Sequence, residues 1–526
     1  MFNILIVDHL EKVGIERLVQ NSNIQYTATG VLTAAELQEL IPEYDALITR
    51  SGTAIDEKLI QHGRNLKVIG RAGVTIDNID LEAATRQGII VMNTPQANSI
   101  ASAEQTLALM LGVSRFTAQS HASLLAGEWD RSKFIGTELA GKTLGIVGFG
   151  RVGRLVAKRA QAFDMHVIAY DPYVSETIGR NLDVTLVDAD DLFAQADYIT
   201  LHSVLNKETE SIINQEAIAQ MKEGVVIINA ARGQLIDELA LAEGLKSGKV
   251  GAAALDVYAV EPPENNPLVG LPNVLHTPHL GSSTKEAQHN VAVQIVEQVL
   301  DALQGTDYRN ALNVPFRAGP DFVATRPYML VAEKIGILQQ ALALAPITKV
   351  ELEVSGDGLA EMVRPVAAAL LHGLLQNQFD HVNTINAPLL AKESGLTITQ
   401  AYDLESGGYT NLISCRVHWH GGQRLISGVL FGGREPRIVQ IDEYHLEANP
   451  IGTLLFMRNK DVPGVIGQVA TLLATYNVNI AEWRLGRTGP GGEALSLVNL
   501  DGHPPQAVLD AIAQAAAVTD VRLVTL

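Results

Sequence analysis

A β-strand, a glycine turn, an α-helix and a second β-strand are predicted by the pattern of residues 142–171. A short apolar run at 144–147 ends in the string GFGRVG, and a second apolar run at 167–170 ends at Asp171. The residues between the two runs follow a helical pattern. This order is typical of one β-α-β unit of a parallel sheet.

Three glycines in this turn fit a bound dinucleotide. Gly148 permits the tight turn, Gly150 lets a pyrophosphate approach the backbone, and Gly153 lets helix and strand pack closely. The helix N-terminus offers free N–H groups to the anion. Asp171 sits where a carboxylate takes the hydroxyls of an adenosine ribose, and it would repel the 2′-phosphate of NADP. The pattern predicts an NAD site, and the alternative is a β-α-β turn with a structural role.

A separate parallel α/β unit is predicted for residues 1–97. Helical stretches alternate there with strand-like runs at 2–7, 45–49, 67–70 and 89–92. Arg50 and Arg71 each follow one of these strands, and ligands of open α/β sheets bind beyond the carboxyl ends of strands. Their guanidinium groups fit a substrate carboxylate or phosphate, with surface salt bridges as the alternative. Asn98 and Ser99 begin a long helical stretch through residue 118, whose free amides form a second candidate anion site.

Polar residues follow the later strands of the nucleotide unit. These strands are expected at 198–201, 225–228, 251–255 and 274–276. Arg232, Glu261 and His279 each come after one of the last three. Because the strand ends of one doubly wound sheet share an edge, the three side chains can converge although they are far apart in the sequence.

These three residue types fit hydride transfer from an alcohol. Histidine titrates nearest neutral pH and can remove the hydroxyl proton while the hydride leaves for a nicotinamide. The Glu261 carboxylate can fix the tautomer of His279 and stabilise its cationic form. Arg232 can bind a substrate carboxylate and polarise the adjacent carbonyl oxygen. Taken singly, His279 better fits a loop histidine and Glu261 a solvated turn residue, so the prediction depends on their joint occurrence.

Two further units are expected after residue 315. Residues 316–450 predict an α+β domain without a catalytic constellation, with a helix around 366–375 and strands at 349–354, 412–420 and 437–441. Residues 452–526 predict a β-α-β-β-α-β order, which is ferredoxin-like. Its elements are expected at 453–457, 465–476, 479–487, 494–500, 506–516 and 520–526.

Composition narrows the class of protein. The chain has 526 residues, 47% hydrophobic and 18% charged, which indicates three or four globular domains. A formal net charge of −19 argues against nucleic acid or an anionic membrane as a partner, so an anionic substrate needs local arginines. The single cysteine, Cys415, excludes an internal disulfide and a cysteine metal cluster, and no metal is expected. Neither a signal peptide nor a membrane-spanning run is apparent, so we expect a cytoplasmic enzyme.

The motifs resemble those of the D-isomer-specific 2-hydroxyacid dehydrogenases. The resemblance rests on the glycine string with Asp171 and on NAARGQLIDELAL, LDVYAVEPPENNPL and TPHLGSST, and it covers about the first 315 residues. RAGVTIDNIDLEAAT and NTPQANSIASAEQTLALML look like the phosphoglycerate dehydrogenase branch of that family. The resemblance implies a Rossmann-type NAD-binding domain, residues 98–283, which is inserted in a flavodoxin-like substrate domain, residues 1–97 and 284–315.

The resemblance also implies roles for individual residues. Arg232, Glu261 and His279 take the catalytic roles. Cofactor contacts beyond the glycine string and Asp171 fall on Arg151, Val152, Ser203, Ala230, Asp256, Gly281 and Ser282. Substrate contacts fall on Arg50, Arg71, Asn98 and Ser99. The chain departs from the pattern at Thr75, where the family usually has a glycine, so the loop after Arg71 is expected to differ in shape because a β-branched residue tolerates a positive φ badly.

The activity implied is NAD-dependent oxidation of 3-phospho-D-glycerate to 3-phosphooxypyruvate, the first step of L-serine synthesis. Reduction of 2-oxoglutarate is an expected side activity. The alternatives are a glyoxylate or hydroxypyruvate reductase, and a dinucleotide-sensing interaction protein. The family further suggests a homotetramer built as a dimer of dimers, in which Trp129 reaches a neighbouring subunit, with packing inside its own chain as the alternative.

The C-terminal units resemble regulatory domains of the long form of these enzymes. Residues 382–389 resemble its intervening domain, which is associated with effects of anions or substrate on activity. Residues 452–526 resemble the ACT family of amino-acid sensors. Asn459, Asp461 and Asn479 occupy positions that bind L-serine in related dehydrogenases, and a dimerisation scaffold without a serine response is the alternative.

Overall fold

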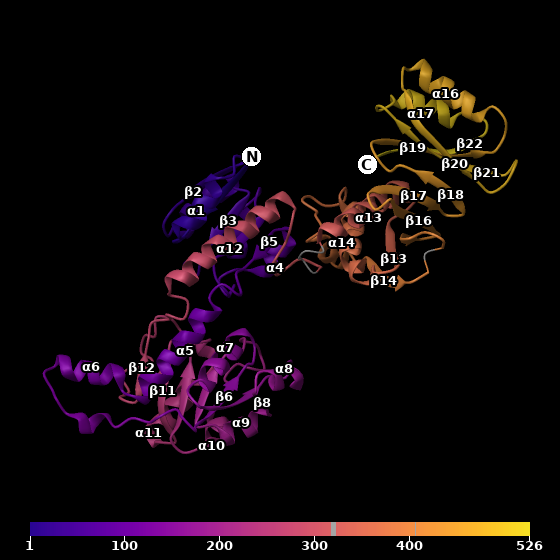
Figure 1. The fold of residues 1–526 in the computed structure, drawn as a ribbon. Coiled ribbons are helices and arrows are strands. Elements are labelled where there is room, and N and C mark those ends of the chain that lie inside the picture. Colours follow the sequence, from indigo (N-terminus) through magenta and orange to yellow (C-terminus); the bar gives the residue numbers. More distant parts are fainter. Residues whose placement is uncertain (317–321, 406) are drawn as a thin grey trace.

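The computed structural model describes residues 1–316, 322–405 and 407–526. These residues form four sheets, of five, seven, six and four strands. Figure 1 shows an elongated molecule in which the seven-stranded sheet lies at one end and the four-stranded sheet at the other. The predicted fold class, two parallel α/β units followed by two α+β units, is confirmed.

The first sheet has the strand order β2-β1-β3-β4-β5, and every pair in it is parallel. This is the flavodoxin-like doubly wound order. The strands are β1 (Phe2–Ile6), β2 (Ile24–Ala28), β3 (Ala46–Thr49), β4 (Val68–Arg71) and β5 (Ile90–Met92). The predicted runs at the N-terminus correspond to β1, β3, β4 and β5. Strand β2 was missed because four of its five residues are exposed at the sheet edge.

Helices cover both faces of this first lobe. One face packs against α1 (Lys12–Val19) and α12 (Lys285–Gln304), and the other packs against α2 (Ala34–Leu40), α3 (Glu57–His62) and α4 (Leu81–Arg86). Helix α12 begins after Thr284, whose hydroxyl accepts the Ala287 N–H, and it buries Val291, Ile295 and Val299 at helical spacing against β3 and β4. The chain therefore returns to its first lobe after the second lobe is complete.

The second sheet has the order β12-β11-β10-β9-β6-β7-β8 and is parallel throughout. Its strands are β6 (Thr143–Val147), β7 (His166–Tyr170), β8 (Thr185–Leu186), β9 (Tyr198–Leu201), β10 (Val225–Asn229), β11 (Val250–Leu255) and β12 (Val274–His276). One face is covered by α5 (Ser99–Ser114), α7 (Arg151–Gln161) and α8 (Glu176–Asn181). The other is covered by α9 (Ala189–Gln195), α10 (Gln215–Gln220) and α11 (Glu238–Ser247).

The helix predicted from residue 98 to residue 118 is shorter than expected. Helix α5 ends at Ser114, and Phe116 adopts a left-handed φ of 50°, which interrupts the helix before α6 (Thr117–Leu125) begins. The segment around α6 projects from the second lobe (Figure 1). Trp129 on this projecting segment is 81% exposed, so packing within its own chain is wrong.

The third sheet has the order β14-β13-β15-β16-β17-β18. Its strands are β13 (Ile347–Ser355), β14 (Thr397–Asp403), β15 (Leu412–Trp419), β16 (Gly422–Phe431), β17 (Glu435–Ile441) and β18 (Tyr444–Ala448). Helices α13 (Phe322–Leu342), α14 (Val363–Leu375) and α15 (Ala387–Glu393) share its hydrophobic core. Cys415 is fully buried there, as its interpretation as a small hydrophobe requires.

A turn of this third unit contacts the first lobe beside α4. The Asn383 side chain donates to the Gly88 carbonyl at 2.7 Å, and the Asn386 side chain donates to the Arg86 carbonyl at 3.2 Å. Ile385, only 5% exposed, packs into the core of the first lobe. The third unit is thereby attached to the first lobe by both polar and apolar contacts.

The fourth sheet has the antiparallel order β20-β21-β19-β22. Its elements follow the predicted ferredoxin-like order as β19 (Thr453–Lys460), α16 (Val465–Thr475), β20 (Ile480–Arg487), β21 (Glu493–Leu500), α17 (Gln506–Ala513) and β22 (Val518–Thr525). One face packs against α16 and α17. Side chains such as Leu454, Phe456 and Leu495 instead join the core of the third unit, so the two C-terminal units share buried surface.

Within residues 1–316, 322–405 and 407–526, no helix has both the length and the apolar character that crossing a bilayer requires.

Candidate active site

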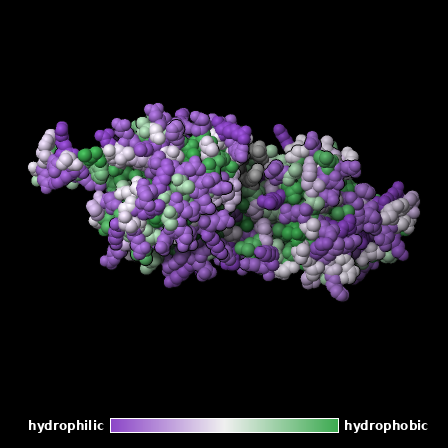
Figure 2. All heavy atoms as spheres, turned by 90° about the horizontal axis from the view of Figure 1, so that it is seen from below, coloured by the Kyte–Doolittle hydropathy of each residue, from purple (hydrophilic) through white to green (hydrophobic). Residues whose placement is uncertain are grey.

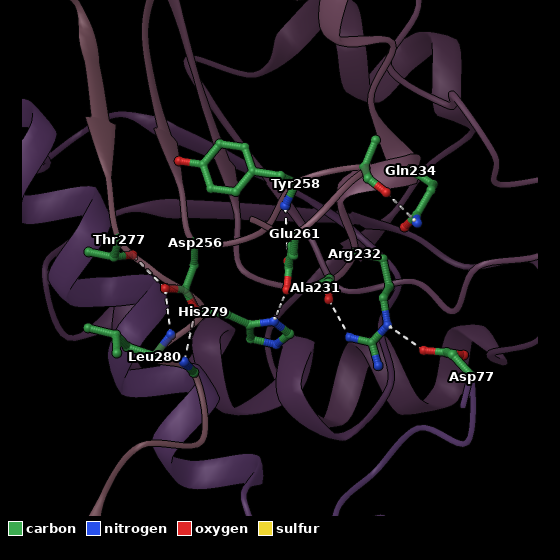
Figure 3. A network of polar contacts seen from close by, with 12 residues as sticks. Asp77, Ala231, Arg232, Gln234, Asp256, Tyr258, Glu261, Thr277, His279 and Leu280 are labelled. Atoms are coloured by element: carbon green, nitrogen blue, oxygen red, sulfur yellow. Dashed lines mark hydrogen bonds and ion pairs between the residues drawn. The ribbon is translucent and has the colours of Figure 1, made fainter. Parts of the chain in front are cut away.

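The predicted histidine and glutamate form a direct pair. The Nδ1 of His279 lies 2.7 Å from Oε2 of Glu261, and the two side chains are 49% and 38% exposed. The other Glu261 oxygen, Oε1, accepts the Tyr258 N–H at 3.1 Å. Figure 3 shows the imidazole lying against the glutamate, with Arg232 nearby. Because a carboxylate at neutral pH only accepts hydrogen bonds, Nδ1 carries the proton in this pair and Nε2 keeps a lone pair.

Buried Asp256 fixes the loop that carries His279. Its side chain is fully buried, and its oxygens accept the N–H groups of Leu280 and Gly281, each at 2.8 Å. The hydroxyl of Thr277 donates to the same carboxylate, and the Asp256 carbonyl accepts the His279 N–H at 2.8 Å. His279 itself has a left-handed φ of 54°, a conformation that non-glycine residues hold only with support from their surroundings. Asp256 provides that support, in addition to the cofactor contact predicted for it.

Arg232 connects the two lobes at this site. Its Nε lies 3.7 Å from the Asp77 carboxylate of the first lobe, and its Nη1 donates to the Ala231 carbonyl (Figure 3). Burial lowers the pKa of Arg232, whereas the charges of Asp77 and Glu261 raise it. Arg232 is therefore within electrostatic reach of Glu261, as the sequence predicted.

Three arginines lie within electrostatic reach of one another at the edge between the lobes. Burial, followed by the charges of Arg232 and Arg50, lowers the pKa of Arg71 to about 10. Across the described part of the chain, Arg71 Nε is one of the few buried side-chain atoms without a hydrogen-bond partner. The carboxylates of Asp77 and Asp8 raise this pKa but do not outweigh the other contributions, so the buried and incompletely hydrogen-bonded guanidinium would be stabilised by a further anion. We call Arg50, Arg71 and Arg232 the arginine cluster.

The loop after Arg71 has the shape that its glycine allows. Gly73 has a φ of 157°, and a Cβ there would lie 1.5 Å from the Arg71 guanidinium, so the missing side chain makes room for Arg71. Thr75 does not belong to the described residues with a positive φ. The expected conflict between a β-branched residue and a positive φ therefore does not arise at Thr75.

Asn98 and Ser99 lie at the start of α5, as predicted. Asn98 is the N-cap residue, and in the described structure its side chain makes no capping hydrogen bond, while its carbonyl accepts the Ser102 N–H at 2.9 Å. Ser99 is 8% exposed. The first amides of α5 are thus not occupied by a capping side chain.

The glycine string has the geometry required to hold a dinucleotide. Gly148 has a φ of 93°, and a Cβ there would meet the Ser203 backbone at 2.4 Å; a Cβ on Gly153 would lie 2.3 Å from the Gly148 carbonyl. At Gly150, the N-cap of α7, a Cβ would meet nothing within 4 Å. Two glycines are therefore required by packing, while Gly150 leaves open space at a helix N-terminus, where a pyrophosphate binds. The residues present fit the cofactor.

Other predicted cofactor positions surround this helix start. The Ser203 hydroxyl is buried and, in the regions described, has no hydrogen-bond partner, so it is available to a ligand. Asp171 directly follows β7 and its side chain accepts the Phe149 N–H at 2.9 Å, which ties the carboxylate to the glycine turn. Arg151 begins α7 and reaches the Pro95 carbonyl of the chain crossing between the lobes at 3.4 Å. The remaining positions, Val152, Ala230, Gly281 and Ser282, lie in α7 and in the loops after β10 and β12.

Several residues that support the site were not predicted. Asp77 pairs with Arg232, and the Gln105 amide of α5 donates to Thr277 at 3.2 Å and to Asp256 at 3.4 Å. The Ser102 hydroxyl donates to the Gly281 carbonyl at 3.2 Å. Ser102 and Gln105 are polar and three residues apart in an apolar helix, a signal that could have marked the face toward the site.

The predicted effector residues do not converge within one chain. Asn459 and Asp461 lie at the end of β19, and Asn459 pairs across the sheet with Ala494. Asn479 precedes β20, whose first residue pairs with Leu500 of β21; Leu500 in turn pairs with Thr453, so Asn479 lies at the level of the start of β19. The two groups are therefore separated by nearly the length of β19, about 20 Å at the usual rise of a strand.

Comparison with known proteins agrees with this geometry. Three segments match family descriptions: the D-isomer specific 2-hydroxyacid dehydrogenase NAD binding domain at residues 107–281, the D-3-phosphoglycerate dehydrogenase intervening domain at 324–442 and the ACT domain at 453–517. The NAD-binding match and the glycine string make NAD the cofactor.

Whole-chain similarity extends to D-3-phosphoglycerate dehydrogenases of distant organisms. The chain is 42% identical to that of Methanocaldococcus jannaschii over all of both chains, and 41% identical to that of Synechocystis over all of this chain and 95% of the relative. Among solved structures, a glyoxylate reductase from Paecilomyes thermophila aligns with a TM-score of 0.53 and 31% identity, over 61% of this chain and 98% of its own. The chain therefore belongs to the D-3-phosphoglycerate dehydrogenases, a branch of the D-isomer-specific 2-hydroxyacid dehydrogenase family.

Proposed function

We propose that the protein oxidises 3-phospho-D-glycerate to 3-phosphooxypyruvate with NAD, the first step of L-serine biosynthesis. The observation that carries the proposal is the arginine cluster beside the His279–Glu261 pair. A doubly anionic phosphate and a carboxylate on one small substrate add the negative charge that Asp77 and Asp8 supply only in part to Arg50, Arg71 and Arg232. A non-phosphorylated 2-hydroxy acid would leave part of that positive charge unmatched.

The proposed roles follow from the hydrogen bonds of each side chain. His279 removes the hydroxyl proton at Nε2, because Nδ1 is held by Glu261. Glu261 keeps the ring in that tautomer and stabilises the imidazolium that results. Arg232 holds the substrate carboxylate and polarises the oxygen that becomes a carbonyl. When bound, NAD supplies the hydride acceptor.

Cofactor binding is assigned to the glycine turn and its neighbours. Gly148, Gly150 and Gly153 admit the pyrophosphate, Asp171 takes the ribose hydroxyls, and Ser203 and the His279–Ser282 loop face the nicotinamide end. Arg50, Arg71, Asn98 and Ser99 bind the phosphate end of the substrate. Since Arg232 recognises a carboxylate that other 2-oxo acids share, reduction of 2-oxoglutarate is part of the proposal.

The four units divide, in this proposal, into a substrate domain (1–97 and 284–315), an NAD-binding domain (98–283), an intervening domain (316–450) and an ACT domain (452–526). Serine binds where two ACT domains pair. Asn459 and Asp461 of one chain and Asn479 of a second chain would share it, because the two groups lie at opposite ends of one sheet. Serine titration of the full chain against a variant with Asn459→Ala tests this, and an unchanged response would refute it.

We further propose a cytoplasmic homotetramer built on dimers of the NAD-binding domain. Trp129, Leu125 and Ile135 on the projecting segment around α6 are 81%, 77% and 81% exposed, an unusual density of large apolar side chains for a free surface. Figure 2 shows hydrophobic residues next to this projecting end. We expect the NAD-binding domain of a second chain to bury these apolar side chains.

NADH absorbance tests the proposed reaction. The purified chain with NAD should turn over 3-phospho-D-glycerate at a much higher kcat/KM than D-glycerate. Equal use of the phosphorylated and non-phosphorylated acids would favour a glyoxylate or hydroxypyruvate reductase. No turnover of any 2-hydroxy acid would leave the dinucleotide-sensing alternative.

A further inference from the structure

Glu261 and Arg232 lie in two neighbouring loops of the site, and the position of neither loop is fixed by its strand alone. Arg232 follows β10, and Glu261 follows β11, the neighbouring strand. Each residue lies several positions beyond the last ladder pair, which joins Asn229 and Leu255. The separation between Arg232 and Glu261 therefore depends on contacts between the loops themselves.

Close backbone packing is the first of these contacts. A Cβ on Gly233 would lie 1.8 Å from the Tyr258 carbonyl carbon and 2.2 Å from the Ala259 nitrogen. The residue next to Arg232 thus touches the start of the loop that leads to Glu261. Only glycine permits this approach.

Two side chains, one from the loop after β10 and one from the start of α11, then hold both backbone polar groups of Ala259. The Gln234 amide donates to the Ala259 carbonyl at 3.0 Å, and Oε1 of Glu238 accepts the Ala259 N–H at 2.9 Å. The other oxygen of Glu238 accepts from the Asn266 side chain at 2.8 Å, near the far end of the same loop. We call Gln234, Glu238 and Asn266 the loop clamp.

The clamp connects directly to the reacting pair. Tyr258, the neighbour of clamped Ala259, donates its N–H to Oε1 of Glu261, whose Oε2 meets Nδ1 of His279. Figure 3 shows Gln234 to the right of Tyr258 and the glutamate–histidine pair below it. A shift of Ala259 would therefore move Tyr258 and, through it, the Glu261 carboxylate.

A carboxylate is the group required at position 238. Both of its oxygens accept from N–H donors, so an amide would place its own NH2 donor against one of them. Its place in the first turn of α11 also favours a negative charge. Capping of α11 is performed by Asp237, which accepts the N–H groups of Leu239 and Ala240, so Glu238 is not needed for that purpose.

We propose that Glu238 is a positioning residue of the dehydrogenase: through the Ala259 backbone it holds Glu261 against His279 and at a fixed place relative to Arg232. This inference rests on the roles given above to those three residues. It assigns no contact with substrate to Glu238. Gln234, in the loop after β10, and Asn266, in the loop after β11, contribute to the same clamp.

The test compares Glu238→Ala and Glu238→Gln with wild type in NADH formation from 3-phospho-D-glycerate. We expect kcat to fall about 10-fold in Glu238→Ala, and less in Glu238→Gln, because loosening a reacting group by a fraction of an ångström costs that order of rate. KM for NAD should change less than about twofold, because the clamp lies away from the glycine turn. The acid limb of the kcat profile should move to lower pH, because the imidazolium loses its fixed anionic partner, and we expect the same direction in Glu261→Gln.

Glu243→Gln is the matched control, because Glu243 is an exposed glutamate on the same helix. It should keep the wild-type kcat and pH profile. A structural role alone would lower kcat in proportion to the folded fraction, measured by circular dichroism, without moving the pH profile.

The outcomes separate the clamp from the reaction. If wild type is active and Glu238→Ala keeps the wild-type kcat and pH profile, the positioning role of the clamp is wrong, while the proposed function stands. Full activity in His279→Ala would overturn the proposed function, and the clamp with it. If wild type prefers another 2-hydroxy acid, the proposed specificity for 3-phospho-D-glycerate is wrong. The same variants, assayed with that other acid, then still test the clamp.

Discussion

Replacing Arg71 by methionine should make the ligand-free protein more stable and at the same time impair its use of substrate. Methionine keeps an apolar stem but removes the charge. Burial and the charges of Arg232 and Arg50 lower the pKa of Arg71 to about 10 although the carboxylates of Asp77 and Asp8 raise it, whereas a free guanidinium titrates above about pH 12. At about 1.4 kcal/mol for each pKa unit, the charged form is disfavoured by roughly 3 kcal/mol before an anion binds.

Removing the guanidinium also removes packing contacts, because its Nη1 occupies the space beside Gly73, and this loss offsets part of the gain in stability. We therefore expect Arg71→Met to raise the free energy of unfolding by roughly 1–2 kcal/mol, measured by urea denaturation in phosphate-free buffer. The KM for 3-phospho-D-glycerate should rise about 10- to 100-fold, the value of one charge-assisted contact, while that for D-glycerate changes little.

Inorganic phosphate provides an independent check on the same residue. It should raise the unfolding free energy of wild type by mass action and leave Arg71→Met unaffected. An Arg71→Met protein that is less stable than wild type, responds to phosphate and keeps its KM for the phosphorylated substrate would refute the role given to the arginine cluster.

Three further outcomes test other parts of the structure. Gly150→Ala should leave stability unchanged but raise the KM for NAD, whereas Gly153→Ala should lower the thermal midpoint, because only the second Cβ meets protein atoms, at 2.3 Å; equal melting of the two would contradict this. Burial raises the pKa of the Cys415 thiol to about 12, so the unfolded chain loses that proton near pH 9 while the native chain keeps it. Stability should thus fall above pH 9 by up to about 1.4 kcal/mol per pH unit, and urea denaturation of Cys415→Ala should show a smaller loss. Asn383→Ala removes a hydrogen bond to Gly88 and should cost about 1 kcal/mol, with faster hydrogen exchange at the turn after α4; unchanged exchange would argue against attachment of the third unit there.

The fold was predictable where hydrophobic runs are bounded by turn residues. β9 and β12 have the predicted bounds, and the ferredoxin-like order was found in full. Edge strands such as β2 were not predicted, because a mostly exposed strand lacks the apolar pattern on which the prediction depends. Nor does local sequence show that Leu454 and Phe456 belong to a core shared with the third unit, since that depends on tertiary packing.

The site was predictable as far as strand ends impose convergence. His279 and Glu261 pair as expected because their loops leave the same edge of the sheet. Asp77 and Glu238 were missed because their partners lie in other loops, and no short-range pattern records such contacts. The opposite placement of Asn459 and Asn479 follows from strand register, which a motif does not contain.

The most direct test of the central claim is NADH formation from 3-phospho-D-glycerate and NAD by wild type and by His279→Ala at one enzyme concentration. We expect steady turnover by wild type and a kcat lower by about 100-fold or more in the variant, the usual contribution of a positioned base. Both proteins should bind NADH equally, because the glycine turn is unchanged. Turnover by His279→Ala at the wild-type rate would contradict the role of His279 as the base.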